Sequence, residues 1–185
     1  AFRLPGWRVC WILGPEEYIS NLALAGSFLD GGSNAPLQFA AINFLEPKLV
    51  RSEMKALQLH FKMKRDYVIN RLTKMGFPFT HGSHGNVPNL TFYLWLNLSH
   101  LPGKIQNCLG FFHECLHEKV IIVPGFFFLI NPQNLLKLED VIWYHYVRIL
   151  YGPELNQLAK GMDGIERILD RYGVLPYKIE DKSDN

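Results

Sequence analysis

Residues 1–17 of the chain read AFRLPGWRVCWILGPEE, and this stretch does most to decide the fold. The run from Trp7 to Leu13 is rich in aromatic and β-branched side chains and predicts a short strand. Gly14-Pro15 closes that run. Because proline suits a first helical position and the carboxylates of Glu16 and Glu17 suit the positive end of a helix dipole, a helix is predicted to follow.

The rest of the chain alternates helical and strand-like patterns. Helical spacing dominates from Pro36 to Met75, and Pro47 is expected to split that stretch into two helices. Gly173 is expected to end the last helix. An α/β or α+β domain fits this order best. The other predicted elements are helices over about 105–118 and 154–172 and strands over 90–98, 120–123, 126–130 and 143–150.

The composition is that of a folded and nearly neutral chain. It has 185 residues, of which 48% are hydrophobic, so it can bury a sizeable core and disorder is excluded as its main state. Its 19 Lys and Arg residues against 17 Asp and Glu residues give a net charge of +2. That balance offers no electrostatic reason to expect a nucleic-acid or membrane partner. No apolar run approaches the roughly 20 residues that span a bilayer.

The cysteines and the first residue bear on the setting of the chain. Cys10, Cys108 and Cys115 are odd in number and lack metal-ligand spacing, which favours a reducing, cytoplasmic compartment, with an organelle left open. The chain begins with Ala1 rather than Met, and the opening segment lacks the layout of a signal peptide. We therefore expect it to begin partway through a longer protein.

One zinc-site motif occurs in the sequence. His113 to His117 read HECLH, and on a helix the two imidazoles would share a face and could hold zinc, with Glu114 as the general base of a peptidase. The longer motif with a third histidine is missing. Glu139 is the only carboxylate whose spacing in the sequence suggests a third zinc ligand. We therefore favour an amphipathic helix with solvated histidines and with Cys115 as a small buried residue. No metal is expected.

Two arginines lie inside apolar, strand-like runs. Arg8 lies in GWRVCW and Arg148 in YVRILY. A buried guanidinium needs a partner, because an unpaired buried charge is very costly. Phosphate and carboxylate are natural partners, since both accept two parallel hydrogen bonds from arginine. An internal salt bridge to Asp or Glu is the alternative that the residues leave open.

Several segments together resemble a known family. AFRLPGWRVC (1–10) is similar to the second half of a cofactor-lysine signature, and GGSNAPLQ (31–38) to a Ser-Asn-x-x-x-Gln segment. Residues 91–98 are similar to a Thr-Phe-Tyr-Leu-Trp strand, 123–125 to a Val-x-Pro-Gly turn, and 146–153 to a strand that carries an arginine. In this order they resemble the class I/II aminotransferases, fold type I enzymes that use pyridoxal 5'-phosphate.

The resemblance implies roles for particular residues. Arg8 would bind the cofactor phosphate and Arg148 the α-carboxylate of the substrate. Ser33 and Asn34 would lie near the subunit interface at the rim of the active site, although turn and N-cap roles suit them equally. Phe128 would line the substrate pocket, although its FFF run is more typical of a core. The Schiff-base lysine of the signature lies eight positions before Arg8, which places it just before Ala1.

The resemblance also implies a domain organisation and an activity. Residues 1–47 would end the cofactor-binding large domain, 48–76 would form a connecting helix, 77–179 a small C-terminal α/β domain, and 180–185 a disordered tail. The whole protein would be a homodimeric transferase of amino-acid metabolism that moves an amino group between an α-amino acid and a 2-oxo acid. The isolated chain would be inactive, because it lacks the catalytic lysine.

Three other functions stay open. Proteins like 1-aminocyclopropane-1-carboxylate synthase and the carbon–sulfur lyases share the family scaffold and both arginines. Aminotransferase-like domains also occur as non-catalytic binding modules in regulators. The third alternative, from another class, is the zinc peptidase that would use His113, Glu114 and His117.

Overall fold

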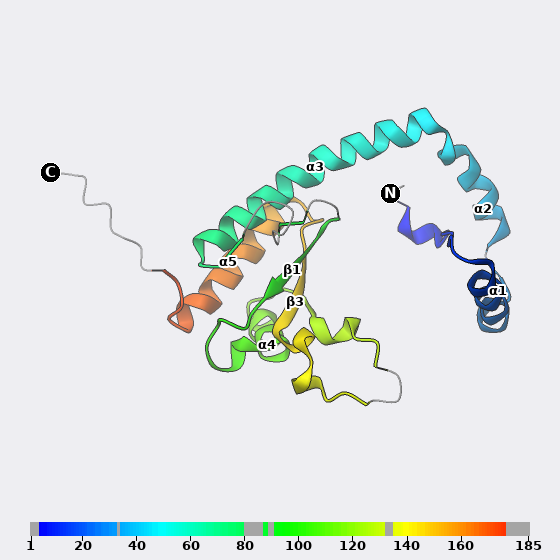
Figure 1. Cartoon of the computed structure of the whole chain (residues 1–185). Helices are drawn as coiled ribbons and strands as arrows, with labels where there is room; N and C mark the ends of the chain where they lie inside the picture. Colours follow the sequence, from blue (N-terminus) through cyan, green and yellow to red (C-terminus); the bar gives the residue numbers. More distant parts are fainter. Residues whose placement is uncertain (1–3, 33, 80–86, 89–90, 132–134, 177–185) are drawn as a thin grey trace. The chain divides into compact units, whose positions relative to one another are not determined.

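The structure is a computed structural model that describes residues 4–32, 34–79, 87–88, 91–131 and 135–176. The chain divides into two compact units, Ala1–His60 and Phe61–Asn185. Figure 1 shows the succession of helices and strands along the chain. Of the helices in the described ranges, none is both long and apolar enough to cross a membrane.

The regular elements in the described residues of the first unit are all helices. α1 (Glu16–Asp30) begins directly after Pro15, carries Glu16 and Glu17 in its first turn, and is followed by Gly31, whose φ of 70° suits glycine. The helix predicted after Pro15 and the split near Pro47 are thus confirmed. The unit comprises η1 (Pro5–Trp7), α1 (Glu16–Asp30), α2 (Ala35–Ile42), η2 (Asn43–Leu45) and the first part of α3 (Pro47–Lys74).

The strand predicted over residues 7–13 is wrong. Trp7 ends η1, and residues 8–14 have no regular secondary structure. A strand forms only by hydrogen bonding to a neighbouring strand, and the described residues of this unit contain no other strand. They also contain no buried apolar side chain, and Leu13 and Phe28 are each 89% exposed. The aromatic and β-branched composition of the run therefore did not suffice to make a strand.

The second unit contains a three-stranded antiparallel sheet in the order β1-β3-β2. Its strands are β1 (Tyr93–Asn97), β2 (Val123–Pro124) and β3 (Tyr146–Leu150). Trp95 of β1 pairs with Arg148 of β3. Because side chains alternate along a strand, one face buries Leu94, Leu96, Val147 and Ile149, and the other presents Tyr93, Trp95, Tyr146 and Arg148.

The core of the second unit joins helices and sheet in one cluster of buried residues. It includes Leu72 from α3, Phe111 from α4 (Cys108–His117) and Ile165 from α5 (Leu155–Arg171). Figure 1 shows these helices around β1 and β3. Gly173 has a φ of 66° just after α5, which confirms the predicted helix end. The mixed α/β class predicted from the sequence is confirmed, whereas the predicted domain bounds stay a prediction.

The strands predicted around residue 125 are shorter than expected. Only Val123–Pro124 pairs as β2, and the predicted strand over 126–130 is wrong, because Gly125–Phe128 forms the 3-10 helix η4. Residues Ile142–His145 form another, η7, so that β3 begins only at Tyr146. Pro124 lacks an amide hydrogen, which favours the end of pairing there. Gly125 packs so closely that a Cβ would overlap the Trp143 carbonyl oxygen.

Candidate functional site

Arg148 lies on β3, and its guanidinium contacts two aromatic rings. Its Cζ atom is 4.2 Å from the ring centroid of Tyr93 and 4.5 Å from that of Phe128. Both contacts are cation–π interactions. Within the described part of the chain, its side chain has no hydrogen bond or ion pair. The internal salt bridge that the sequence left open is therefore absent there, and the donor edge is available to an anion.

Phe128 is exposed rather than part of the core. It ends η4, keeps 43% of its surface exposed and contacts Arg148. The interpretation of Phe128 as a core residue is thus wrong. The structure brings two of the sequence-predicted residues, Phe128 and Arg148, together. It adds Tyr93, which the sequence analysis did not single out, because only the pairing of β1 with β3 places it beside Arg148.

A second layer of aromatic rings supports this arrangement. The ring of Trp95 lies 5.4 Å from that of Phe128, 5.4 Å from that of Trp143, and stacks at 5.8 Å on that of Tyr146. Its indole nitrogen is buried without a hydrogen-bond partner among the residues that the structure describes. The face of the sheet around Arg148 is therefore predominantly aromatic.

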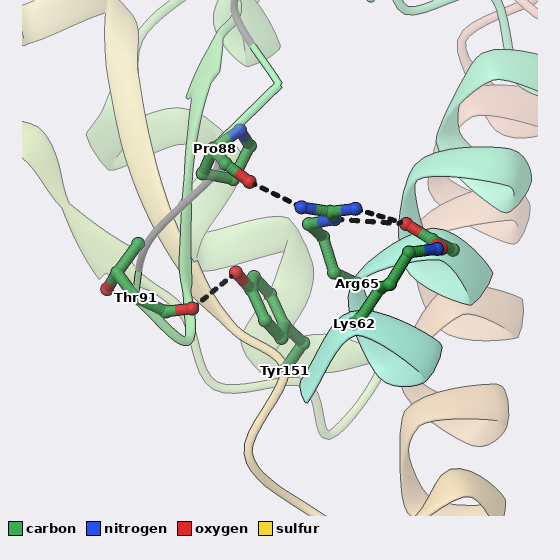
Figure 2. Close-up of polar contacts among 6 residues, drawn as sticks. Lys62, Arg65, Pro88, Thr91 and Tyr151 are labelled. Atoms are coloured by element: carbon green, nitrogen blue, oxygen red, sulfur yellow. Dashed lines mark hydrogen bonds and ion pairs between the residues drawn. The ribbon is translucent and has the colours of Figure 1, made fainter. Parts of the chain in front are cut away.

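Polar contacts tie α3 and the ends of the strands together. Tyr151, directly after β3, donates from its hydroxyl to the carbonyl of Thr91 at 2.8 Å, and Arg65 of α3 donates to the carbonyl of Pro88 at 3.0 Å, as Figure 2 shows. The buried Lys64 donates to the carbonyl of Gly152 at 2.7 Å. The contacts of Tyr151 and Gly152 fix the segment that follows β3, and hence help to hold the strand that carries Arg148.

Arg8 lies in the first unit in an unusual backbone conformation. Its φ of 57° is in the left-handed region, which non-glycine residues rarely adopt. Its guanidinium is exposed, not buried as the apolar run suggested, because that run does not pair as a strand. It donates only to the carbonyl of Pro5 at 3.5 Å and has no carboxylate partner among the described residues. A phosphate dianion would suit this free cation.

Of the two candidate active-site rim residues beside α2, the structure describes only Asn34. Ser33 lies outside the described residues. Asn34 is the N-cap of α2, where its Oδ1 accepts the backbone N–H of Leu37 at 3.1 Å. This confirms the capping role that the sequence offered for Asn34. Its place at a subunit interface stays a prediction.

The HECLH segment forms part of α4, and Glu114 has structural partners there. His113 and His117 are exposed, as expected of solvated histidines. Glu114 is only 5% exposed and pairs with Lys104 at 2.6 Å and Arg171 at 3.5 Å. The hydrogen bond from Lys104 holds the pKa of Glu114 below its usual value. Within the described ranges, no three metal-ligating side chains form a group that could hold a metal ion.

Cys115 is fully buried in the core, as predicted for a small apolar residue. Its burial, together with the nearby charge of Glu114, raises the pKa of the thiol to about 12. A thiol in this state is neither a nucleophile nor a metal ligand at neutral pH. The helix therefore carries a structural ion-pair cluster, and its geometry does not support the zinc peptidase.

The described residues thus include two arginines without a carboxylate partner, Arg8 and Arg148, in a chain of the mixed α/β class. The model of the family "Aminotransferase class I and II" matches residues 1–139. The chain belongs to this family, whose members use pyridoxal phosphate.

Individual relatives agree with the family match. The chain is 35% identical over 128 residues to LL-diaminopimelate aminotransferase of Natranaerobius thermophilus. This match covers 68% of the chain and 30% of that protein. It is 27% identical over 136 residues to the uncharacterized HTH-type transcriptional regulator YisV of Bacillus subtilis, covering 73% of the chain and 26% of the regulator. The chain therefore spans less than a third of these curated relatives.

A solved structure shows the same fold. The aromatic aminotransferase from Pyrococcus horikoshii superposes with a TM-score of 0.72 at 21% identity, and the match covers 94% of the chain and 41% of that enzyme. The fold of nearly the whole chain is thus that of the corresponding part of a fold type I aminotransferase.

Proposed function

We propose that the whole protein transfers an amino group between an α-amino acid and a 2-oxo acid, with Arg148 binding the α-carboxylate of both substrates. The free guanidinium of Arg148 is the observation that carries this proposal. It contacts two aromatic rings and has no acidic partner in the described residues, and the five N–H donors of a guanidinium lie in one plane. A carboxylate is the planar anion that matches such an edge with two parallel hydrogen bonds.

Arg8 would hold the phosphate of the cofactor. Its exposed guanidinium, with one long hydrogen bond to a carbonyl, fits a dianion better than a satisfied internal ion pair would. When bound, pyridoxal phosphate withdraws electrons from the α-carbon of the amino acid. The contribution of this chain is to bind and orient: Arg8 holds the cofactor and Arg148 the substrate.

The 185-residue chain alone is not expected to catalyse the reaction. The family signature places its lysine eight positions before the residue that matches Arg8, and this sequence does not include that position. The chain mixed with pyridoxal phosphate should show neither covalently bound cofactor nor turnover. We further propose that the whole protein is a homodimer, as is typical of the family.

A non-catalytic binding module is the second candidate. It is favoured by the similarity to a protein named as a transcriptional regulator. A regulator of this kind would bind cofactor and amino acid without releasing a 2-oxo acid. The synthase-like and lyase members of the family would use both arginines in the same way, and their products distinguish them from a transaminase.

The role of Arg148 is tested in the whole protein loaded with pyridoxal phosphate. The rate of the half-reaction with an α-amino acid is compared between the parent protein and Arg148→Lys. Lysine keeps the charge but loses the bidentate hydrogen-bonding geometry of arginine. Two charge-assisted hydrogen bonds are at stake, so kcat/KM should fall by about 10²-fold. The matching amine without a carboxylate should react at the same slow rate in both proteins. An equal loss for both substrates would contradict the assignment of Arg148 to the carboxylate.

A further inference from the structure

We propose that Tyr93 and Phe128 are positioning residues that hold the Arg148 guanidinium flat, so that it meets a substrate carboxylate only through its edge. The proposal rests on the carboxylate-binding role of Arg148 proposed above. It adds Tyr93 to the site and assigns Phe128 a task other than forming a pocket wall. For brevity, the two rings are called the guanidinium clamp.

The clamp follows from the distances around Arg148. A guanidinium is planar, and all five of its N–H donors lie in its plane. The Arg148 Cζ atom lies 4.2 Å from one ring centroid and 4.5 Å from the other. The rings of Tyr93 and Phe128 have no mutual ring contact, as expected if the cation separates them. We infer from these distances that the two rings cover the faces of the guanidinium, which leaves the plane of its donors for an anion.

Each ring of the clamp is held by other parts of the fold. Tyr93 stands on β1 and its ring contacts that of Phe92 at 4.3 Å. Phe128 packs edge-on against Trp95, the direct cross-strand neighbour of Arg148. The start of η4 is fixed by Gly125, where no side chain would fit. The clamp is therefore formed before any ligand arrives.

A preformed clamp has a measurable effect on binding. A free arginine side chain samples many rotamers, and ordering it on binding weakens affinity. The two ring contacts remove part of that cost, because the guanidinium is already oriented. Loss of one ring should weaken carboxylate binding about 5- to 10-fold, in the range of a single cation–π contact. The tyrosine hydroxyl has no part in this, so Tyr93→Phe should bind normally.

The experiment uses the whole protein with ¹⁵N-labelled arginine side chains and follows the Nε–H signal of Arg148 by NMR. Two aromatic rings facing the guanidinium should shift this proton signal upfield by their ring currents. The signal should move toward its ordinary position in Tyr93→Leu and in Phe128→Leu, but not in Tyr93→Phe. Phe127→Leu is the matched control, because Phe127 is 68% exposed and stacks on Phe126 rather than on Arg148.

The same samples are titrated with pyruvate as the carboxylate probe. Support for the clamp is a 5- to 10-fold weaker pyruvate affinity in both leucine variants, with Tyr93→Phe and Phe127→Leu unchanged and core amide signals preserved. An ordinary Arg148 signal in the parent chain would overturn the clamp whatever the affinities. If Arg148→Gln loses pyruvate binding while the leucine variants keep it, the clamp fails and the carboxylate site stands. If Arg148→Gln binds as the parent does, both proposals fail.

Discussion

Replacing Glu114 by glutamine is expected to destabilise the second unit by about 1–2 kcal/mol at pH 7. The carboxylate is nearly buried, and it pairs with Lys104 at 2.6 Å and Arg171 at 3.5 Å. Tyr172 also donates to it at 3.2 Å, and glutamine can keep that bond. Lys104 and Arg171 are about half exposed or more, so water rehydrates them after the change, and the loss stays below that of a fully buried pair.

The pH dependence of this loss is the sharper part of the prediction. The pKa of Glu114 in the folded chain is lowered, first by the hydrogen bond from Lys104. A carboxyl with a lowered folded pKa contributes stability above its unfolded pKa, and the contribution is lost as the pH falls through the folded value. The difference between the parent chain and Glu114→Gln should therefore be full at pH 7 and smaller at pH 3.

Urea unfolding followed by tryptophan fluorescence measures this difference. Glu139→Gln is the matched control, because Glu139 is exposed and has no ion pair in the described part of the chain; it should change the free energy of unfolding by less than about 0.5 kcal/mol. The same loss at pH 7 and pH 3, or no loss at either, would refute the structural role of Glu114. Destabilisation by a zinc chelator would revive the metal site.

Three further substitutions and one chemical modification test the packing. Gly110→Ala should destabilise the fold by about 2–3 kcal/mol, because the new Cβ would overlap the Lys104 carbonyl oxygen. Gly161→Ala, with open space around it on α5, should stabilise the fold by about 0.5–1 kcal/mol. Urea unfolding compares the two variants. Tyr151→Phe should cost about 1 kcal/mol, since the hydrogen bond to Thr91 is lost; an unchanged midpoint would contradict this. A thiol reagent at pH 8 should label the exposed Cys10 at once, and Cys108 and Cys115 only on unfolding; rapid labelling of all three would show an open core.

Local sequence patterns predicted most of the second unit, because its elements are amphipathic and meet in one core. The helix that becomes α5 and the strand that becomes β1 were found from the spacing of apolar residues. The same reasoning failed for residues 7–13, since strand-like composition does not provide a pairing partner. It failed for Phe127 and Phe128 because their exposure depends on the turn at Gly125, where backbone packing decides the chain path.

The candidate site was predicted in part. Arg148 was identified because a cation in an apolar run requires a partner, and the resemblance supplied the kind of anion. Tyr93 was missed because it lies 55 positions from Arg148 in the sequence, and their contact depends on the pairing register of two strands. The partners of Glu114 were missed for the same reason, since Lys104 and Arg171 come from different elements.

Amino-group transfer itself is tested most directly by following nitrogen. The whole protein with pyridoxal phosphate is given ¹⁵N-labelled α-amino acids and an unlabelled 2-oxo acid, and the products are analysed by mass spectrometry. The account predicts that the label appears in the new α-amino acid, and only when the cofactor is present. Label released as ammonia, label retained in a cyclised amino acid, or no product at all would contradict it.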